Sequence, residues 1–148
     1  MNAVRSGLVM DGLPESLGMV QGVDVLTFGA PRAVSEMLAA ACPGVNIVSK
    51  PLAGVYSSRP APFIAGFCFL KSELTRALPA FKRLLASGGT LWVFWPGPAA
   101  WDAEGIRPEM GVTAAAVSAC ADALGLAADE SRVLDDVWSG MRLRPASS

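Results

Sequence analysis

Few side chains in this 148-residue sequence are suited to acid–base, nucleophilic or metal chemistry. There is no histidine, which removes the commonest general base near neutral pH, the commonest zinc ligand and every nucleophile that relies on a histidine partner. The three cysteines, Cys42, Cys68 and Cys120, form no CxxC pair, so nothing completes a metal shell around them. We therefore predict three reduced thiols, no metal site and no catalytic residue.

The remaining charged groups allow two further interpretations. Asp102, Glu104 and Glu109 fall close together, but their spacing matches no calcium or magnesium loop, and solvated loop charges are the favoured interpretation. Arg142 and Arg144 alternate near the C-terminus, where they could contact phosphate or block pairing at a solvated sheet edge.

Composition places the chain among globular proteins. Hydrophobic residues make up 52% and charged residues 17% of the sequence, and the formal net charge is -1. This balance provides no overall field that would attract nucleic acid or an anionic membrane, so neither is expected as a partner. The length predicts one domain, 1–148, with an N-terminal extension over 1–20 and a flexible tail over 145–148. Because no apolar signal segment develops before Asp11, we predict a cytoplasmic location.

Apolar runs and helical spacing alternate along the chain. Apolar runs predict strands at 23–28, 63–69 and 90–95, and a short second strand is predicted at 45–48. Amphipathic spacing predicts helices opened by Pro31, capped by Ser72 and starting near Thr113, the second kinked or split at Pro79. The segments 49–62 and 96–111 are predicted as loops, and 131–144 as two short strands around Trp138–Gly140.

This alternation predicts an α/β domain with a mostly parallel sheet, helices on both faces and an antiparallel hairpin at the end. In such sheets ligands bind outside the carboxyl ends of the strands. Candidate ligand contacts at these ends are Gly29, Ala30, Ser49, Lys50 and Lys71. Candidates for a partner or ligand surface lie at the end of the fourth strand and in the loop after it: Trp95, Pro96, Trp101 and Asp102.

Several segments resemble an uncharacterised bacterial family of small domains of unknown function. The family is typified by a Gly-Gly-x-Leu-Trp-Val-x-Trp-Pro strand and a Trp-Ser-Gly-Leu-Lys hairpin. The matching stretches are VLTFGAPRAV (25–34), ELTRALPAFKRLLASGGTLWVFWP (73–96), GVTAAAVSACADALGL (111–126) and DDVWSGMRL (135–143). The resemblance implies a single three-layer, reduced Rossmann-type domain similar to S-adenosylmethionine-dependent methyltransferases, and it implies no activity. Many relatives have a lysine where this chain has Gly97.

The cofactor motifs of such enzymes are incomplete in this sequence. A nucleotide-binding turn needs several glycines, but only Gly29 is present and Pro31 lacks an N–H donor. The second strand ends in Ser49 and Lys50 rather than in an acidic residue for ribose hydroxyls. We therefore expect no S-adenosylmethionine cofactor and a non-catalytic binding or interaction module. The alternatives are an enzyme that binds S-adenosylmethionine or another small molecule, and a structural domain that oligomerises.

The tryptophan-containing segment after the fourth strand is the expected contact surface. Tryptophan is enriched at interfaces, and large apolar patches seldom stay exposed on a monomer. We therefore predict a homo-oligomer formed through this segment, with an unknown protein or a small molecule as the other possible partner.

Overall fold

The computed structural model describes residues 22, 24–42, 44–134 and 137–145, and these residues build one six-stranded sheet. The predicted extension 1–20 and residues 146–148 of the predicted tail lie outside the described residues. The sheet order is β2-β1-β3-β4-β6-β5. The strands are β1 (Asp24–Phe28), β2 (Asn46–Lys50), β3 (Ala61–Phe67), β4 (Leu85–Pro96), β5 (Leu126–Leu134) and β6 (Trp138–Pro145). Strands β1 to β4 pair in parallel, and β6 pairs antiparallel with both β4 and β5.

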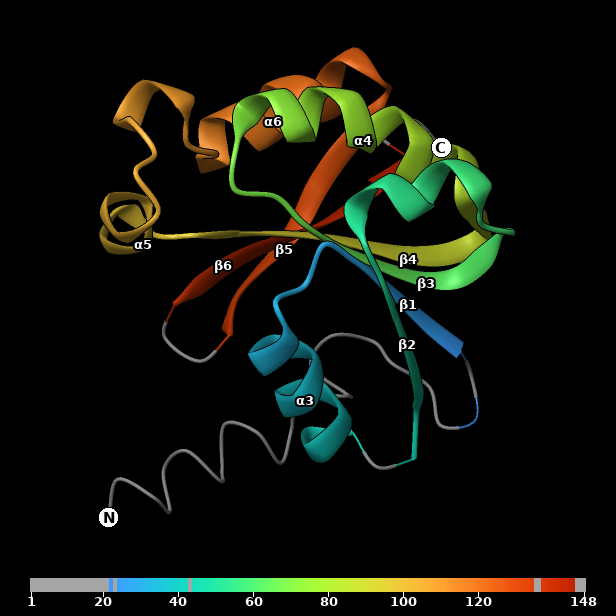
Figure 1. Cartoon of the computed structure of the whole chain (residues 1–148). Helices are drawn as coiled ribbons and strands as arrows, with labels where there is room; N and C mark the ends of the chain where they lie inside the picture. Colours follow the sequence, from blue (N-terminus) through green and yellow to red (C-terminus); the bar gives the residue numbers. More distant parts are fainter. Residues whose placement is uncertain (1–21, 23, 43, 135–136, 146–148) are drawn as a thin grey trace.

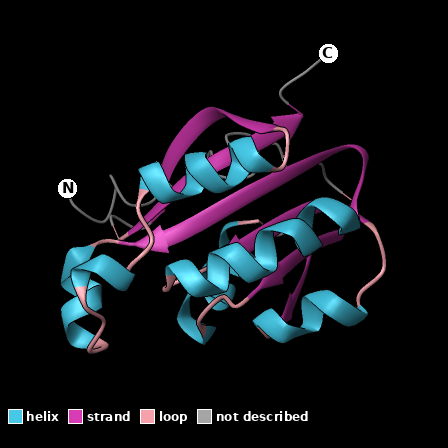
Figure 2. Cartoon of the chain, turned by 90° about the horizontal axis from the view of Figure 1, so that it is seen from above, coloured by secondary structure: helices cyan, strands magenta, loops and turns pink. Residues whose placement is uncertain are grey.

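Helices cover both faces of the sheet, which confirms the α/β prediction (Figure 1). Helix α3 (Arg32–Ala41) packs on one face, with Val34 and Leu38 in an apolar cluster around Trp92. Helices α4 (Lys71–Leu84) and α6 (Ala114–Ala123) lie side by side over the other face (Figure 2). The fold therefore has three layers, and its two apolar clusters lie on opposite sides of the sheet.

Helix boundaries differ from the sequence-based predictions in three places. Pro31 is the N-cap of α3 rather than its first residue. Leu70, not Ser72, is the N-cap of α4, because Glu73 accepts hydrogen bonds from the free backbone N–H groups there. Helix α4 is not split at Pro79, which lies on the exposed side where water can reach the backbone carbonyl that lacks a partner.

Strand and loop boundaries also need correction. Strand β4 begins at Leu85, so Ser87–Gly89 belong to it through an irregular pairing with β3. Residues Trp138–Gly140 lie within β6, because they pair with the end of β4 instead of forming a turn. The segments predicted as loops contain the short helices η1 (Leu52–Ser57), α5 (Pro98–Ala103) and η2 (Pro108–Met110). Prolines at or just before the first turn favour such short helices.

No helix among the described residues is long and apolar enough to cross a membrane. Cys42 and Cys68 are buried and Cys120 is half-buried, and none of these three described cysteines forms a disulfide.

Candidate functional site

The strand order reverses around β1, which has β2 on one side and β3 on the other. In open α/β sheets the ligand crevice lies outside the carboxyl ends of strands at such a reversal. Gly29 follows β1 at this point with φ +77°, a conformation that favours glycine. A Cβ atom at Gly29 would lie 2.7 Å from the Phe67 carbonyl oxygen, so the backbones of the two strand ends nearly touch.

The turn after β1 has few backbone donors to offer a ligand. The Gly29 N–H donates to the Lys50 carbonyl oxygen at 2.9 Å, which ties the end of β1 to the end of β2. Pro31 has no N–H to offer, and Ala30 between them is half-buried. Positions 29 and 31 therefore offer no free N–H to an anionic or nucleotide ligand, which several backbone N–H groups hold in other α/β proteins.

Ser49, a predicted ligand contact, is part of a chain of hydroxyl groups. Thr27 Oγ1 donates to Ser49 Oγ, and Ser49 Oγ donates to Ser35 Oγ, both at 2.9 Å. Thr27 is fully buried, so this chain satisfies the one buried polar side chain of the described core. The three hydroxyls link β1, β2 and α3, and their role in the structure is to hold these elements together.

Lys50 points away from Ser49, because neighbouring strand residues face opposite sides of a sheet. Its ammonium group contacts Ser58 Oγ at 3.1 Å, and the Ser58 hydroxyl donates to the Gly54 carbonyl oxygen at 2.8 Å. Lys50 lines a groove of about 400 Å³ on the η1 side of the sheet. The two predicted contacts at the end of β2 therefore belong to different sites.

Glu73, which the sequence analysis did not identify, binds the backbone N–H groups just after β3. Glu73 Oε1 accepts hydrogen bonds from the Phe69 N–H at 2.9 Å and the Leu70 N–H at 3.0 Å. Its position three residues after the N-cap is the signal that could have identified it. Lys71, the first residue of α4, is half-buried, and no bond among the described residues joins it to Gly29.

Cys68, between β3 and Glu73, carries no reactive thiolate. Burial raises the pKa of the Cys68 thiol to about 12, and the negative charge of Glu73 adds to the rise. A thiol with this pKa stays protonated at neutral pH, and the protonated form is a poor nucleophile. Cys68 acts as a small core side chain.

The tryptophans within and after β4 are buried inside this chain. Trp92 and Trp95 face opposite sides of the sheet, as predicted, and belong to the two different apolar clusters. Trp95 and Trp101 are each only 7% exposed. The Trp101 ring packs directly on Gly111, and its buried Nε1 has no acceptor among the described residues. Pro96 is buried at the end of β4, and the Asp102 side chain lies outside what the structure describes.

A small cavity of about 250 Å³ lies between η1 and the start of α4. Leu52 connects it to the end of β1, since a Cβ at Gly29 would lie 3.5 Å from Leu52 Cβ. The residues that line it are Leu52, Ala53, Tyr56, Ser72, Glu73, Arg76 and Ala77. Glu73 and Arg76 give this cavity one negative and one positive group.

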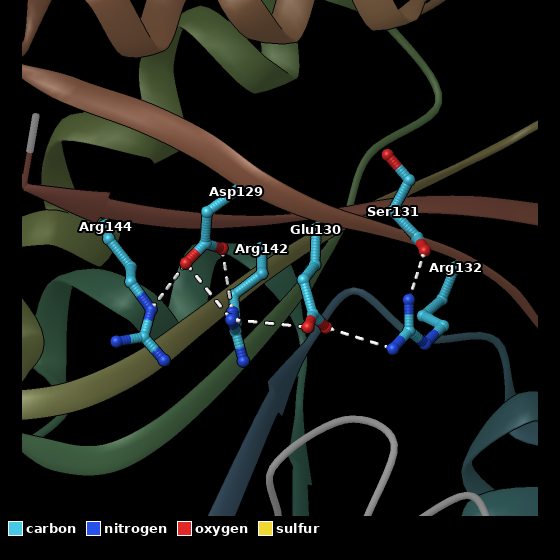
Figure 3. A network of polar contacts seen from close by, with 6 residues as sticks. All are labelled: Asp129, Glu130, Ser131, Arg132, Arg142 and Arg144. Carbon is cyan, nitrogen blue, oxygen red and sulfur yellow. Dashed lines mark hydrogen bonds and ion pairs between the residues drawn. The ribbon is translucent and has the colours of Figure 1, made fainter.

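The arginines of the C-terminal hairpin are held by carboxylates (Figure 3). Arg142 donates two hydrogen bonds to Asp129, at 2.8 and 3.1 Å, and lies 3.6 Å from Glu130. Arg144 pairs with the second Asp129 oxygen at 2.8 Å. Arg142 and Arg144 lie on β6, which pairs with β4 on one side and β5 on the other, so the interpretation that they block pairing at a sheet edge is wrong. Their carboxylate partners on β5 also leave less positive charge for a phosphate.

The fold matches those of S-adenosylmethionine-dependent methyltransferases. Mitomycin 7-O-methyltransferase MmcR superposes with a TM-score of 0.66 at 13% identity, over 95% of this chain and 54% of that one. The magnesium protoporphyrin IX methyltransferase ChlM from Synechocystis PCC 6803 has a TM-score of 0.59 at 9% identity, over 95% and 83%. A TehB-like methyltransferase from Corynebacterium glutamicum has a TM-score of 0.56 at 10% identity, over 92% and 87%.

These similarities define the class of fold and nothing finer. No protein-family model matches the sequence, and no curated protein matches it. The chain spans about half the length of the mitomycin methyltransferase. It therefore has a methyltransferase-like Rossmann fold, as predicted, whereas any activity has to be argued from its own residues.

Proposed function

We propose that this chain is a binding or interaction module on a methyltransferase-like scaffold and that it does not transfer methyl groups. The observation that carries the proposal is the closed turn after β1, where the Gly29 N–H is bonded to Lys50 and Pro31 has no N–H. The end of β2 also supports the proposal. Ser49 is bonded within the hydroxyl chain and the next residue is Lys50, so this strand ends without an acidic residue for ribose hydroxyls.

Titration calorimetry of the full chain with S-adenosylmethionine tests this proposal. We expect no binding, or a dissociation constant near 1 mM, which corresponds to about -4 kcal/mol. A dissociation constant in the low micromolar range, about -7 to -8 kcal/mol, would overturn it. S-adenosylhomocysteine serves as the matched probe, because it keeps the adenosine group and lacks the methyl group and its positive charge.

The second candidate function is an enzyme or small-molecule binder. The cavity between η1 and α4 favours it, because Glu73 and Arg76 offer both charges beside the end of β1. An ordered ligand in this cavity in a crystal of the purified protein would favour this function over the first.

The homo-oligomer and the cytoplasmic location stay predictions. The burial of Trp101 favours a core role for that residue, so the exposed Val137 beside Gly97 becomes the better contact candidate. Sedimentation at tens of micromolar tests this, and a monomer there would rule the homo-oligomer out.

A further inference from the structure

The positively charged side chains fall into two groups: arginines that form ion pairs with carboxylates, and the cations of residues 50–83. From Lys50 to Arg83 the sequence carries six cations and one acidic residue, Glu73. All the ion pairs among the described residues involve other arginines, on α3, before η2 and on the C-terminal hairpin. Glu73 itself accepts from backbone N–H groups. The 50–83 stretch therefore presents positive charge that no described carboxylate neutralises.

Two of these cations, Lys50 and Arg59, line the same groove. The groove has a volume of about 400 Å³ and is lined by Asp24, Leu26, Lys50, Ser58, Arg59, Pro60, Ala61 and Pro62. Its one carboxylate, Asp24, accepts a hydrogen bond from Asn46 Nδ2 at 2.9 Å. The volume is within the range of small-molecule sites, and the lining has a net positive charge.

Lys50 is held in place more firmly than a typical surface lysine. Its stem lies along Gly54, where an added Cβ would be 3.3 Å from Lys50 Cβ. Its ammonium group contacts Ser58 at 3.1 Å, and the Ser58 hydroxyl is fixed by the Gly54 carbonyl. An ammonium group has three N–H donors, so two stay available to a ligand. A cation that is already ordered loses less conformational entropy on binding.

We propose that this groove binds a small molecule through a compact oxyanion, either a phosphoryl group or a pair of carboxylates. Lys50 supplies a fixed positive charge, and Arg59 supplies a planar guanidinium that can pair with two oxygens of the anion. Leu26 and the prolines at 60 and 62 provide the apolar wall for the rest of the ligand. The groove lining does not include the turn at Gly29, so the groove is a different site from that turn, although the Lys50 carbonyl accepts the Gly29 N–H.

Titration of the full chain with pyrophosphate and with succinate at constant ionic strength tests the proposal. We expect at least one of them to bind with a dissociation constant of about 1 mM or lower, and the tighter of the two identifies the anion class. Lys50→Gln and Arg59→Gln should each weaken binding about tenfold, because each removes one charge-assisted contact. Ser58→Ala keeps the charge but frees the ammonium group, and a loss of about threefold is expected.

Arg83→Gln is the matched control, because it removes one positive charge from the exposed side of α4, outside the groove. It should change binding less than twofold. Equal losses in Arg83→Gln and Lys50→Gln would mean that any polyanion binds a diffuse basic face, and the proposal would be wrong. Absence of binding by both probes at about 10 mM also overturns it.

A measurement on the unmodified protein covers the case in which a variant fails to fold. Backbone amide shifts followed during the pyrophosphate and succinate titrations should move most at Gly54, Ser58 and Arg59. Shifts confined to other parts of the chain would contradict the groove as the site.

Discussion

Ser49 and Lys50 are neighbours at the end of β2, yet the structure uses them in opposite ways. On the α3 side, the Ser49 hydroxyl has partners in Thr27 and Ser35. On the η1 side, the Lys50 ammonium group has Ser58 and no carboxylate partner among the described residues. The same strand end therefore carries one polar group that is satisfied within the protein and one that retains binding capacity.

The hairpin arginines extend this comparison to groups of the same charge. Arg142 is bonded to Asp129 and close to Glu130, and its side chain is only 16% exposed. Lys50 and Arg59 have equal formal charge but face a groove with a single, already bonded carboxylate. Residue type alone does not separate structural cations from binding cations, whereas the number of partners does.

Gly29→Ala should have the largest effect, because it strains the turn that joins the end of β1 to the end of β2. The substitution places a Cβ 2.7 Å from the Phe67 carbonyl oxygen and forces a positive φ on alanine. We expect a loss of about 3 kcal/mol in the free energy of unfolding, measured by urea denaturation.

Gly88→Ala separates the two causes. Gly88 has φ +75° with nothing within 4 Å of an added Cβ, so only the cost of the positive φ applies, about 1 kcal/mol. If both variants lose the same amount, the backbones of β1 and β3 are not in the close contact described.

Thr27→Val tests the hydroxyl chain directly. Valine has nearly the same shape, and it removes the hydrogen bond that buried Thr27 donates to Ser49. We expect a loss of about 1 kcal/mol in the free energy of unfolding. Lys50→Gln should change that free energy by less than about 0.5 kcal/mol, because Lys50 contributes binding capacity rather than stability. Similar losses in both variants would remove the contrast between the two faces of β2.

Much of the fold could be predicted from the sequence. The apolar runs at β1, β3 and β4 are continuous because both faces of these strands are covered, and that pattern identifies buried parallel strands. Boundaries were harder to predict where tertiary pairing decides them. Ser87–Gly89 have the composition of a helix end, but pairing with β3 extends β4 through them.

The sequence predicts which residues could contact a ligand, but not whether their polar groups are free to do so. The rule for parallel sheets predicts candidate contacts at Gly29, Ser49 and Lys50. Whether a donor is free depends on contacts between distant residues, such as Thr27 with Ser49 and Lys50 with Ser58. The groove beside Lys50 could not be predicted, because its lining comes from β1, from the end of β2 and from residues 58–62, which only the fold brings together.

Asp129→Asn should have a small effect that depends on pH. The hydrogen bond from Arg142 lowers the pKa of the Asp129 carboxyl, burial opposes this, and the charges of Arg142 and Arg144 add to the lowering. A carboxylate with a lowered pKa stabilises the fold above its unfolded pKa near 4, and this contribution is lost as the pH falls through the folded-state pKa. Because the side chain is 37% exposed, we expect a contribution below about 1 kcal/mol at pH 7. Urea denaturation at pH 7 and near pH 2 should show that the difference in free energy of unfolding between Asp129→Asn and the unmodified protein shrinks in acid.

Asp122→Asn, on the exposed face of α6, is the control, and its free energy of unfolding should not differ from that of the unmodified protein. A difference that persists unchanged near pH 2 would mean that Asp129 acts through packing rather than through its charge on the arginines.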